Sequence, residues 1–253
     1  MAQNFRRLDI LQILQQDGKV TVEGLASRFD VTLQTIRRDL TVLSETNKIE
    51  RVHGGAVLPS STTNIEYEER QFLNGAAKRR IAEACAAQIP NGCCVFLNIG
   101  TSTEAVARQL LHHSDLMVVT NNVNVATILI ENPKCQTVMT GGRLRAADNG
   151  LVGSVAINSI RQFKFDIAVI GCSALDAQGD LLDFDIEEVG VSQTIIAQSR
   201  QCFLVADHSK FTRLAPARIT SLQALSGVFT DLPFSDALQK KCVDWDTQVT
   251  VSR

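Results

Sequence analysis

Five short loops between residues 98 and 211 carry side chains that suit the binding of a small, hydroxylated anion. Together they hold hydroxyls, amides, cations and carboxylates, and most of them follow a short apolar run. In open sheets of alternating strands and helices, ligands bind beyond the carboxyl ends of the strands, often at helix N-termini. The ligand-binding candidates are Gly100, Thr101, Ser102, Thr103, Asn121, Asn122, Gly142, Arg143, Arg145, Asp185, Glu188, His208 and Lys210.

The loop that begins at Gly100 is suited to holding a phosphate. Gly100 lets the backbone approach closely, residues 101–103 offer hydroxyls, and the following helix start offers unpaired N–H groups. Lys210 adds a point charge for phosphate, while Asp185 and Glu188 can accept hydrogen bonds from ligand hydroxyls. Taken singly, these loops are equally consistent with helix caps or solvated turns, and a lone histidine favours a structural role. Their combination indicates a binding site.

Other ligand classes lack support in the sequence. There is no GxGxxG fingerprint, no GxxxxGK[ST] loop and no zinc-ligand spacing. We therefore expect no nucleotide, no metal and no cofactor.

Strands and helices alternate from residue 93 onward, which would bring these loops together. We expect strands at 93–99, 116–120, 137–139, 165–170, 202–206, 227–230 and 248–251, and helices at 66–87, 104–111 and 122–130. Repeated alternation of this kind predicts a mostly parallel sheet covered by helices. The loops at the strand ends would then line one edge of that sheet.

A second set of polar residues lies on the third of three amphipathic segments in residues 5–43. Thr32 is the expected N-cap of this helix, as Thr21 is of the one before it. Ile36, Leu40 and Leu43 form its apolar stripe, which leaves two adjacent arginines on the opposite side. This polarity is typical of a helix-turn-helix, in which arginine binds guanine or phosphate. The alternative is a three-helix domain with a solvated charged face.

Residues 48–58 predict a short hairpin, or wing, that could reach phosphates or a minor groove. Asn47 is expected to end the preceding helix in the left-handed conformation. Asp39 is interpreted as structural, because an acid would repel DNA phosphates. The DNA-binding candidates are Thr32, Gln34, Thr35, Arg37, Arg38, Thr41, Lys48, Arg51, His53, Gly54 and Gly55.

The length and composition of the chain indicate a globular protein of two domains. Its 253 residues carry a net charge of -2, so any DNA contact depends on local charge and not on a bulk basic field. We predict domains at 1–58 and 75–253 with a linker at 59–74. The seven scattered cysteines, and no apparent signal peptide or long apolar run, favour a reduced cytoplasmic protein without a membrane segment.

The segments 33–40 (LQTIRRDL) and 51–56 (RVHGGA) resemble the N-terminal signature of the DeoR family of bacterial repressors. The resemblance extends through the second domain. It implies a winged helix-turn-helix that represses transcription at double-stranded operator DNA, and an α/β effector domain similar in fold to ribose-5-phosphate isomerase. It further implies release by a phosphorylated sugar or polyol, with glycerol-3-phosphate expected. Residues 100–103 and Lys210 would hold the phosphate, and Asp185 and Glu188 would face the hydroxyls.

One departure from the family pattern bears on function. Family members often carry a lysine shortly after the Glu188 position, whereas residues 189–193 here contain no cation. An isomerase needs a well-placed acid–base set, so we expect a regulator and not an enzyme. The alternative is a sugar-phosphate isomerase-like enzyme with an appended DNA-binding domain. An activator built from the same parts also stays open. A homo-dimer or homo-tetramer would place two DNA-binding heads on a repeated site.

Overall fold

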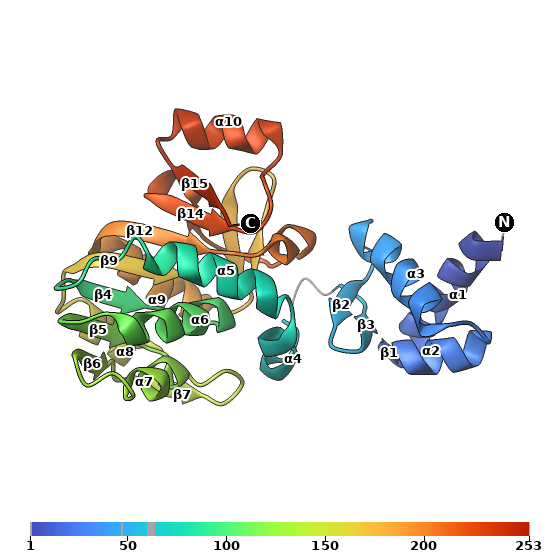
Figure 1. Cartoon of the computed structure of the whole chain (residues 1–253), viewed down its shortest axis with the longest axis horizontal. Coiled ribbons are helices and arrows are strands. Elements are labelled where there is room, and N and C mark those ends of the chain that lie inside the picture. Colours follow the sequence, from blue (N-terminus) through green and yellow to red (C-terminus); the bar gives the residue numbers. More distant parts are fainter. Residues whose placement is uncertain (1, 47, 60–63, 253) are drawn as a thin grey trace.

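The computed structural model describes residues 2–46, 48–59 and 64–252, which form a small N-terminal head and a larger sensor lobe (Figure 1). The predicted helix end at Asn47 and residues 60–63 of the predicted linker lie outside the described residues. Within the described ranges, no helix is long and apolar enough to cross a membrane.

The head contains three helices and a three-stranded sheet. Its elements are α1 (Ala2–Asp17), β1 (Lys19–Thr21), α2 (Val22–Phe29), α3 (Leu33–Glu45), β2 (Glu50–Val52) and β3 (Gly55–Val57). The expected caps are present, since the Thr21 hydroxyl accepts from the Gly24 N–H and the Thr32 hydroxyl accepts from the Thr35 N–H. The predicted stripe of α3 is buried in the core of the head.

The wing is wider than the sequence predicts. The expected hairpin pairs β2 with β3, but β1 also joins in the order β1-β3-β2. β3 approaches β1 closely at Gly55, where an added Cβ would lie 1.9 Å from the Val20 carbonyl oxygen. Glycine at this position therefore allows the third strand to pair.

A seven-stranded parallel sheet forms the centre of the sensor lobe, in the order β15-β14-β12-β9-β4-β5-β6. The strands are β4 (Cys94–Leu97), β5 (Leu116–Thr120), β6 (Cys135–Met139), β9 (Phe165–Ile170), β12 (Ser199–Val205), β14 (Gly227–Thr230) and β15 (Gln248–Val251). All seven predicted strands are present, and every pairing between neighbours is parallel. The predicted fold class is confirmed.

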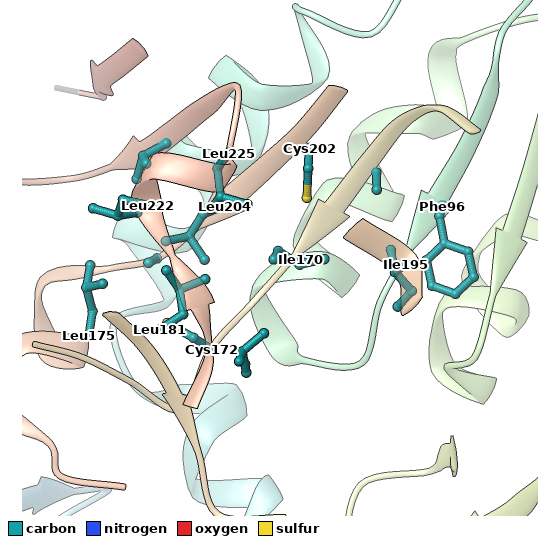
Figure 2. Packing of buried hydrophobic residues seen from close by; sticks show 14 of the residues in the cluster. Phe96, Ile170, Cys172, Leu175, Leu181, Ile195, Cys202, Leu204, Leu222 and Leu225 are labelled. Atoms are coloured by element: carbon teal, nitrogen blue, oxygen red, sulfur yellow. The ribbon is translucent and has the colours of Figure 1, made fainter. Parts of the chain in front are cut away.

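Helices cover both faces of this sheet. One face packs on α5 (Gly75–Ala86), α6 (Thr101–Gln109) and α7 (Val123–Leu129), and the other on α8 (Ser154–Ile160), α9 (Ile186–Ala197) and α10 (Asp236–Asp244). Alternate residues of one strand point to opposite faces. Thus Val95 and Leu97 of β4 lie in the first core and Phe96 in the second. Figure 2 shows the second core, in which Ile170 and Leu204 come from adjacent strands.

Several elements of the sensor lobe are not predicted by the sequence. They are the hairpin of β7 (Arg143–Arg145) with β8 (Gly150–Val152), a small sheet of β10 (Ala174–Leu175), β11 (Asp180–Asp183) and β13 (Ala217–Ser221), and helices α8, α9 and α10. The helix expected over 66–87 is divided into α4 (Tyr67–Phe72) and α5, because Asn74 takes a left-handed conformation between them.

Candidate DNA-binding surface and effector site

The polar side of α3 is open to solvent. Gln34, Arg37, Arg38 and Thr41 are exposed, while Thr35 is half-buried near the helix start. The hydroxyls of Thr32 and Thr35 lie 2.9 Å apart, and that of Thr41 donates to the Arg37 carbonyl over 2.8 Å. The threonine hydroxyls therefore form hydrogen bonds within the helix region itself. Gln34, Arg37 and Arg38 present exposed side chains to solvent.

Asp39 does not pair with its helix neighbours. It is 1% exposed and accepts hydrogen bonds from Arg6 over 2.6 Å and from Arg7 over 3.0 Å. These charge-assisted bonds fix α1 against α3. The structural interpretation of Asp39 is thus supported, although its partners come from α1 and not from the arginines beside it.

The wing lies against the same surface. Arg51 donates to the Arg37 carbonyl over 3.3 Å, and its pKa is lowered by burial and by the nearby Arg37 charge. Lys48, His53 and Gly54 are exposed, whereas Gly55 is buried in the pairing with β1. Helix α3 and the wing therefore form one continuous surface that carries Arg37, Arg38, Lys48 and Arg51.

In the sensor lobe, the carboxyl ends of the three central strands β4, β9 and β12 meet as expected. Their loops line a cavity of about 30 Å³ with contributions from Gly100, Thr101, Ser102 and Lys210. Gly100 has φ +140° at the start of α6, a conformation that favours glycine. The Thr103 hydroxyl donates to the Asn98 carbonyl over 2.6 Å and is fully buried, so it braces the loop.

Four cations converge behind this loop. Lys210 is joined by Lys78 of α5, Arg70 of α4 and Arg213, and the charges of the other three affect the pKa of Lys78. Burial lowers the pKa of Lys78 and of Lys210 to about 8 each. Lysine pKa values fall when desolvation outweighs the available counter-charge. The cluster is thus short of negative charge and suits an anionic ligand.

Asp207 is the counter-charge in this cluster. Burial opposes its ionisation, but the Lys210 charge and the Ser209 N–H lower its pKa to about 2. It also accepts from Asn74 over 2.7 Å. A carboxylate held in this way stays ionised and orders the cations around it.

Several carboxylates line a larger cavity of about 700 Å³, which shares Arg70, Ser173 and Glu188 with the cavity at Gly100. The Arg145 guanidinium lies among these carboxylates. It donates hydrogen bonds to Asp148 over 2.9 and 2.6 Å and also to Asp185 and Glu188. Burial, followed by the Asp183 charge, raises the pKa of Glu188 to about 7. Arg145 from β7 therefore brings a cation to the region where the sequence lacks a lysine after Glu188.

Three further candidates, Asn121, Asn122 and Gly142, line neither cavity and hold the loops instead. Asn122 is buried, caps α7 through the Asn124 N–H and donates to Glu104. Asn121 is also buried and donates to the Leu151 carbonyl over 3.2 Å. Gly142 has φ +137° and packs close to the Val152 carbonyl.

Two further candidates point toward the surface. Arg143 is exposed and pairs with Glu187 at the outer end of the β7 hairpin. His208 Nδ1 lies 2.6 Å from Asp231, a hydrogen bond that raises the histidine pKa. Neither side chain lines the cavity at Gly100.

Sequence reasoning missed several residues of the site. Arg70 and Ser173 line both cavities, Tyr67 lines the larger one, and Lys78 lies in the cation cluster. Lys78 could have been found from spacing, because it precedes the buried Ile81 by three positions and Cys85 by seven on the apolar stripe of α5. A lysine on a buried stripe signals a paired or ligand-binding charge.

A winged helix-turn-helix joined to a parallel α/β lobe defines a transcription regulator of two domains. Two family models match the chain: a DeoR-like helix-turn-helix domain over residues 6–62 and a DeoR C terminal sensor domain over residues 73–232. The chain belongs to the DeoR family. The expected family membership is thus confirmed.

Curated relatives agree with this assignment. Glycerol-3-phosphate regulon repressors of Escherichia coli (strain K12) and Haemophilus influenzae are 44% and 46% identical to the chain. The alignments cover 92% of this chain, and 92% and 91% of those relatives, respectively. The E. coli HTH-type transcriptional repressor CsqR is 37% identical over 97% of this chain and 94% of its own. The chain is therefore a DeoR-family transcriptional repressor and not an enzyme, as expected.

Two solved structures align with part of the chain. A D-ribose-5-phosphate isomerase in complex with phospho-erythronic acid aligns with a TM-score of 0.40 and 16% identity over 53% of this chain and 52% of that chain. The eIF2B delta subunit from Chaetomium thermophilum aligns with a TM-score of 0.48 and 16% identity over 66% of this chain and 58% of that chain.

Proposed function

We propose that this repressor leaves its operator DNA when a phosphorylated polyol or sugar binds the sensor lobe, with glycerol-3-phosphate as the first ligand to test. The observation that carries the proposal is the pair formed by buried Lys78 and half-buried Lys210 behind the Gly100 loop. Two lysines with pKa values lowered to about 8 lie beside a helix start. A phosphate would supply the missing negative charge, and the helix N-terminus would add its own attraction.

The phosphate and hydroxyl ends of the ligand have separate places in this proposal. The phosphate lies against the backbone of residues 100–102 and takes its counter-charge from Lys210, Lys78 and Arg70. The hydroxyls face the larger cavity, where Asp185 and Glu188 accept hydrogen bonds. The names of the glycerol-3-phosphate regulon repressors support the choice of ligand.

At the other end of the chain, α3 would enter the major groove and the wing would contact the backbone. Arg37 and Arg38 are exposed for this purpose, with Lys48, Arg51 and His53 on the wing. We place the DNA-binding domain at 1–58, the linker at 59–74 and the sensor domain at 75–253. A homo-dimer or homo-tetramer in the cytoplasm would present paired heads to a repeated operator.

Isothermal titration calorimetry of the full chain tests the ligand. Glycerol-3-phosphate is expected to bind, glycerol is expected not to bind, and inorganic phosphate is expected to bind more weakly. The Lys210→Gln variant should lose most of the affinity for glycerol-3-phosphate while keeping its affinity for DNA. Equal binding of glycerol and glycerol-3-phosphate would contradict the assignment of the phosphate site.

A further inference from the structure

An ion pair joins the wing of the head to the sensor lobe. Arg213 lies just after the loop that carries Lys210, and its guanidinium pairs with Glu50 of β2. Among the described residues, this is the ion pair that connects the head directly to the lobe containing the parallel sheet. Two other contacts reach only α4: Lys19 pairs with Glu69, and the His53 ring lies 5.2 Å from that of Phe72.

Arg213 is buried although it is an arginine. Its side chain is 2% exposed and that of Glu50 is 14% exposed. Within the described part of the chain, none of the three guanidinium nitrogens of Arg213 has a hydrogen-bond partner, and neither does Glu50 Oε1, so the two residues form an ion pair without a hydrogen bond. Buried donors without an acceptor are unfavourable, so the contact with Glu50 leaves the guanidinium incompletely satisfied.

The same guanidinium lies close to the cation cluster behind the Gly100 loop, because Arg213 directly follows the short 3-10 helix His208–Thr212 that carries Lys210. The charges of Glu50, Asp207 and Arg70 all act on Arg213, and Arg213 in turn lowers the pKa of Lys210. Arg213 therefore pairs with the wing carboxylate and follows Lys210 of the cation cluster by three residues, just outside the lining of the cavity at Gly100. A phosphate monoester carries about two negative charges and three strong acceptor oxygens, more than one carboxylate offers.

We propose that Arg213 binds the wing through Glu50 when the sensor lobe is empty and binds the phosphate of the effector when the lobe is filled. This inference rests on the proposed function and adds the route by which the site acts on the head. The phosphate competes with Glu50 for one guanidinium and thereby frees the wing. A neighbouring cavity of about 400 Å³, lined by Glu50, Asn74 and Arg213 among others, leaves room for the wing carboxylate to withdraw.

Competition between Glu50 and the phosphate predicts the direction in which the affinity for phosphate changes when Glu50 is substituted. If Glu50 and the phosphate share Arg213, removal of the Glu50 charge should raise the affinity for the phosphate, although Glu50 lies in the DNA-binding domain. Coupling between two sites is reciprocal for binding free energies. Because Glu50→Gln also removes the ion pair with Arg213, it should weaken the contact between the head and the lobe in the absence of ligand.

The test is calorimetric titration of the full chain with glycerol-3-phosphate, without DNA. Glu50→Gln should bind about fivefold more tightly than the wild type, at the lower end of typical couplings. Glu50→Asp, which keeps the charge but shortens its reach, should lie between the two and serves if Glu50→Gln does not fold. Inorganic phosphate should follow the same order of affinities.

Two control variants separate this route from general loosening of the head. Glu69→Gln breaks the Lys19 pair without freeing Arg213, and Glu23→Gln removes a first-turn acid of α2. Both should bind glycerol-3-phosphate with wild-type affinity. Tightening in Glu69→Gln equal to that in Glu50→Gln would overturn the competition for Arg213.

The two proposals fail in different ways. If the wild type and all variants bind neither glycerol-3-phosphate nor inorganic phosphate, the proposed function is contradicted. If the wild type binds glycerol-3-phosphate and Glu50→Gln and Glu50→Asp bind it with the same affinity, the proposed function stands and the role of Arg213 is contradicted.

Discussion

The pH dependence of effector binding follows directly from two lysines, buried Lys78 and half-buried Lys210. Lys78 and Lys210 have pKa values lowered to about 8, so raising the pH from 7 to 9 removes most of their charge before any ligand arrives. At pH 7 each is about nine-tenths protonated and at pH 9 about one-tenth, which follows from a pKa of about 8. A phosphate monoester, with its second pKa near 6, stays close to dianionic over this range.

The size of the effect can be worked out from these occupancies. If the phosphate binds only the charged form of one lysine, affinity should fall about tenfold between pH 7 and pH 9. If both lysines must be charged, the loss is about 100-fold, or about 2.7 kcal/mol. The affinity falls as the pH rises because the bound phosphate favours the protonated form of each lysine.

Calorimetric titration at several pH values between 6.5 and 9 measures this dependence. Proton uptake on binding should appear near pH 8 as a heat that changes with the ionisation enthalpy of the buffer. The Lys210→Gln variant should show a weaker affinity and a shallower slope with pH. Affinity that is constant from pH 7 to pH 9 would refute the assignment of these lysines to the phosphate.

Three further predictions concern the head and the stability of the sensor lobe. Arg37→Ala or Arg38→Ala should weaken operator binding by about 1–3 kcal/mol in fluorescence anisotropy, and unchanged affinity in both would remove them from the DNA surface. Asp39→Asn should destabilise the head by about 2–3 kcal/mol in thermal unfolding, because two arginines lose a buried partner; Asp9→Asn on the exposed side of α1 is its control, and equal effects would contradict the clamp. Lys78→Met should stabilise the ligand-free lobe at pH 7 by about 1–3 kcal/mol, since a folded-state pKa below the unfolded value means that the charge opposes folding. That gain should shrink as the pH rises from 8 to 10.5, and a gain independent of pH would contradict its electrostatic origin.

Regular patterns account for the parts of the fold that the sequence predicts well. Central parallel strands are buried on both faces, so β4 and β9 appear as nearly continuous apolar runs. Thr21 and Thr32 mark helix starts because their hydroxyls satisfy backbone N–H groups that the helix leaves free.

Long-range contacts account for most of what the sequence does not predict. The three residues of β1 form a strand only because Gly55 lets β3 approach them. The partners of Asp39 lie 32 and 33 positions away in α1. Arg213 and Glu50 belong to different domains of the chain, and neither lies in a sequence motif that would predict their contact.

Residue type also fails to separate ligand-binding side chains from those that hold the loops. Asn121 and Asn122 follow a strand, as a binding loop would, yet both are buried and hydrogen-bonded to neighbouring elements. Lys78 stands in a run of three cations that suggests a solvated face, yet it is 6% exposed. Only the packing of α5 on the sheet distinguishes it from its neighbours.

The central claim is that a phosphorylated ligand in the sensor lobe takes the head off DNA. Its most direct test is fluorescence anisotropy of the full chain on a DNA fragment selected for tight binding, titrated with glycerol-3-phosphate. We predict that the ligand releases the DNA from the wild type and not from Lys210→Gln, which should bind the same fragment equally well in its absence. Release that is equally strong in Lys210→Gln, or a wild-type complex that tightens as glycerol-3-phosphate is added, would contradict the account.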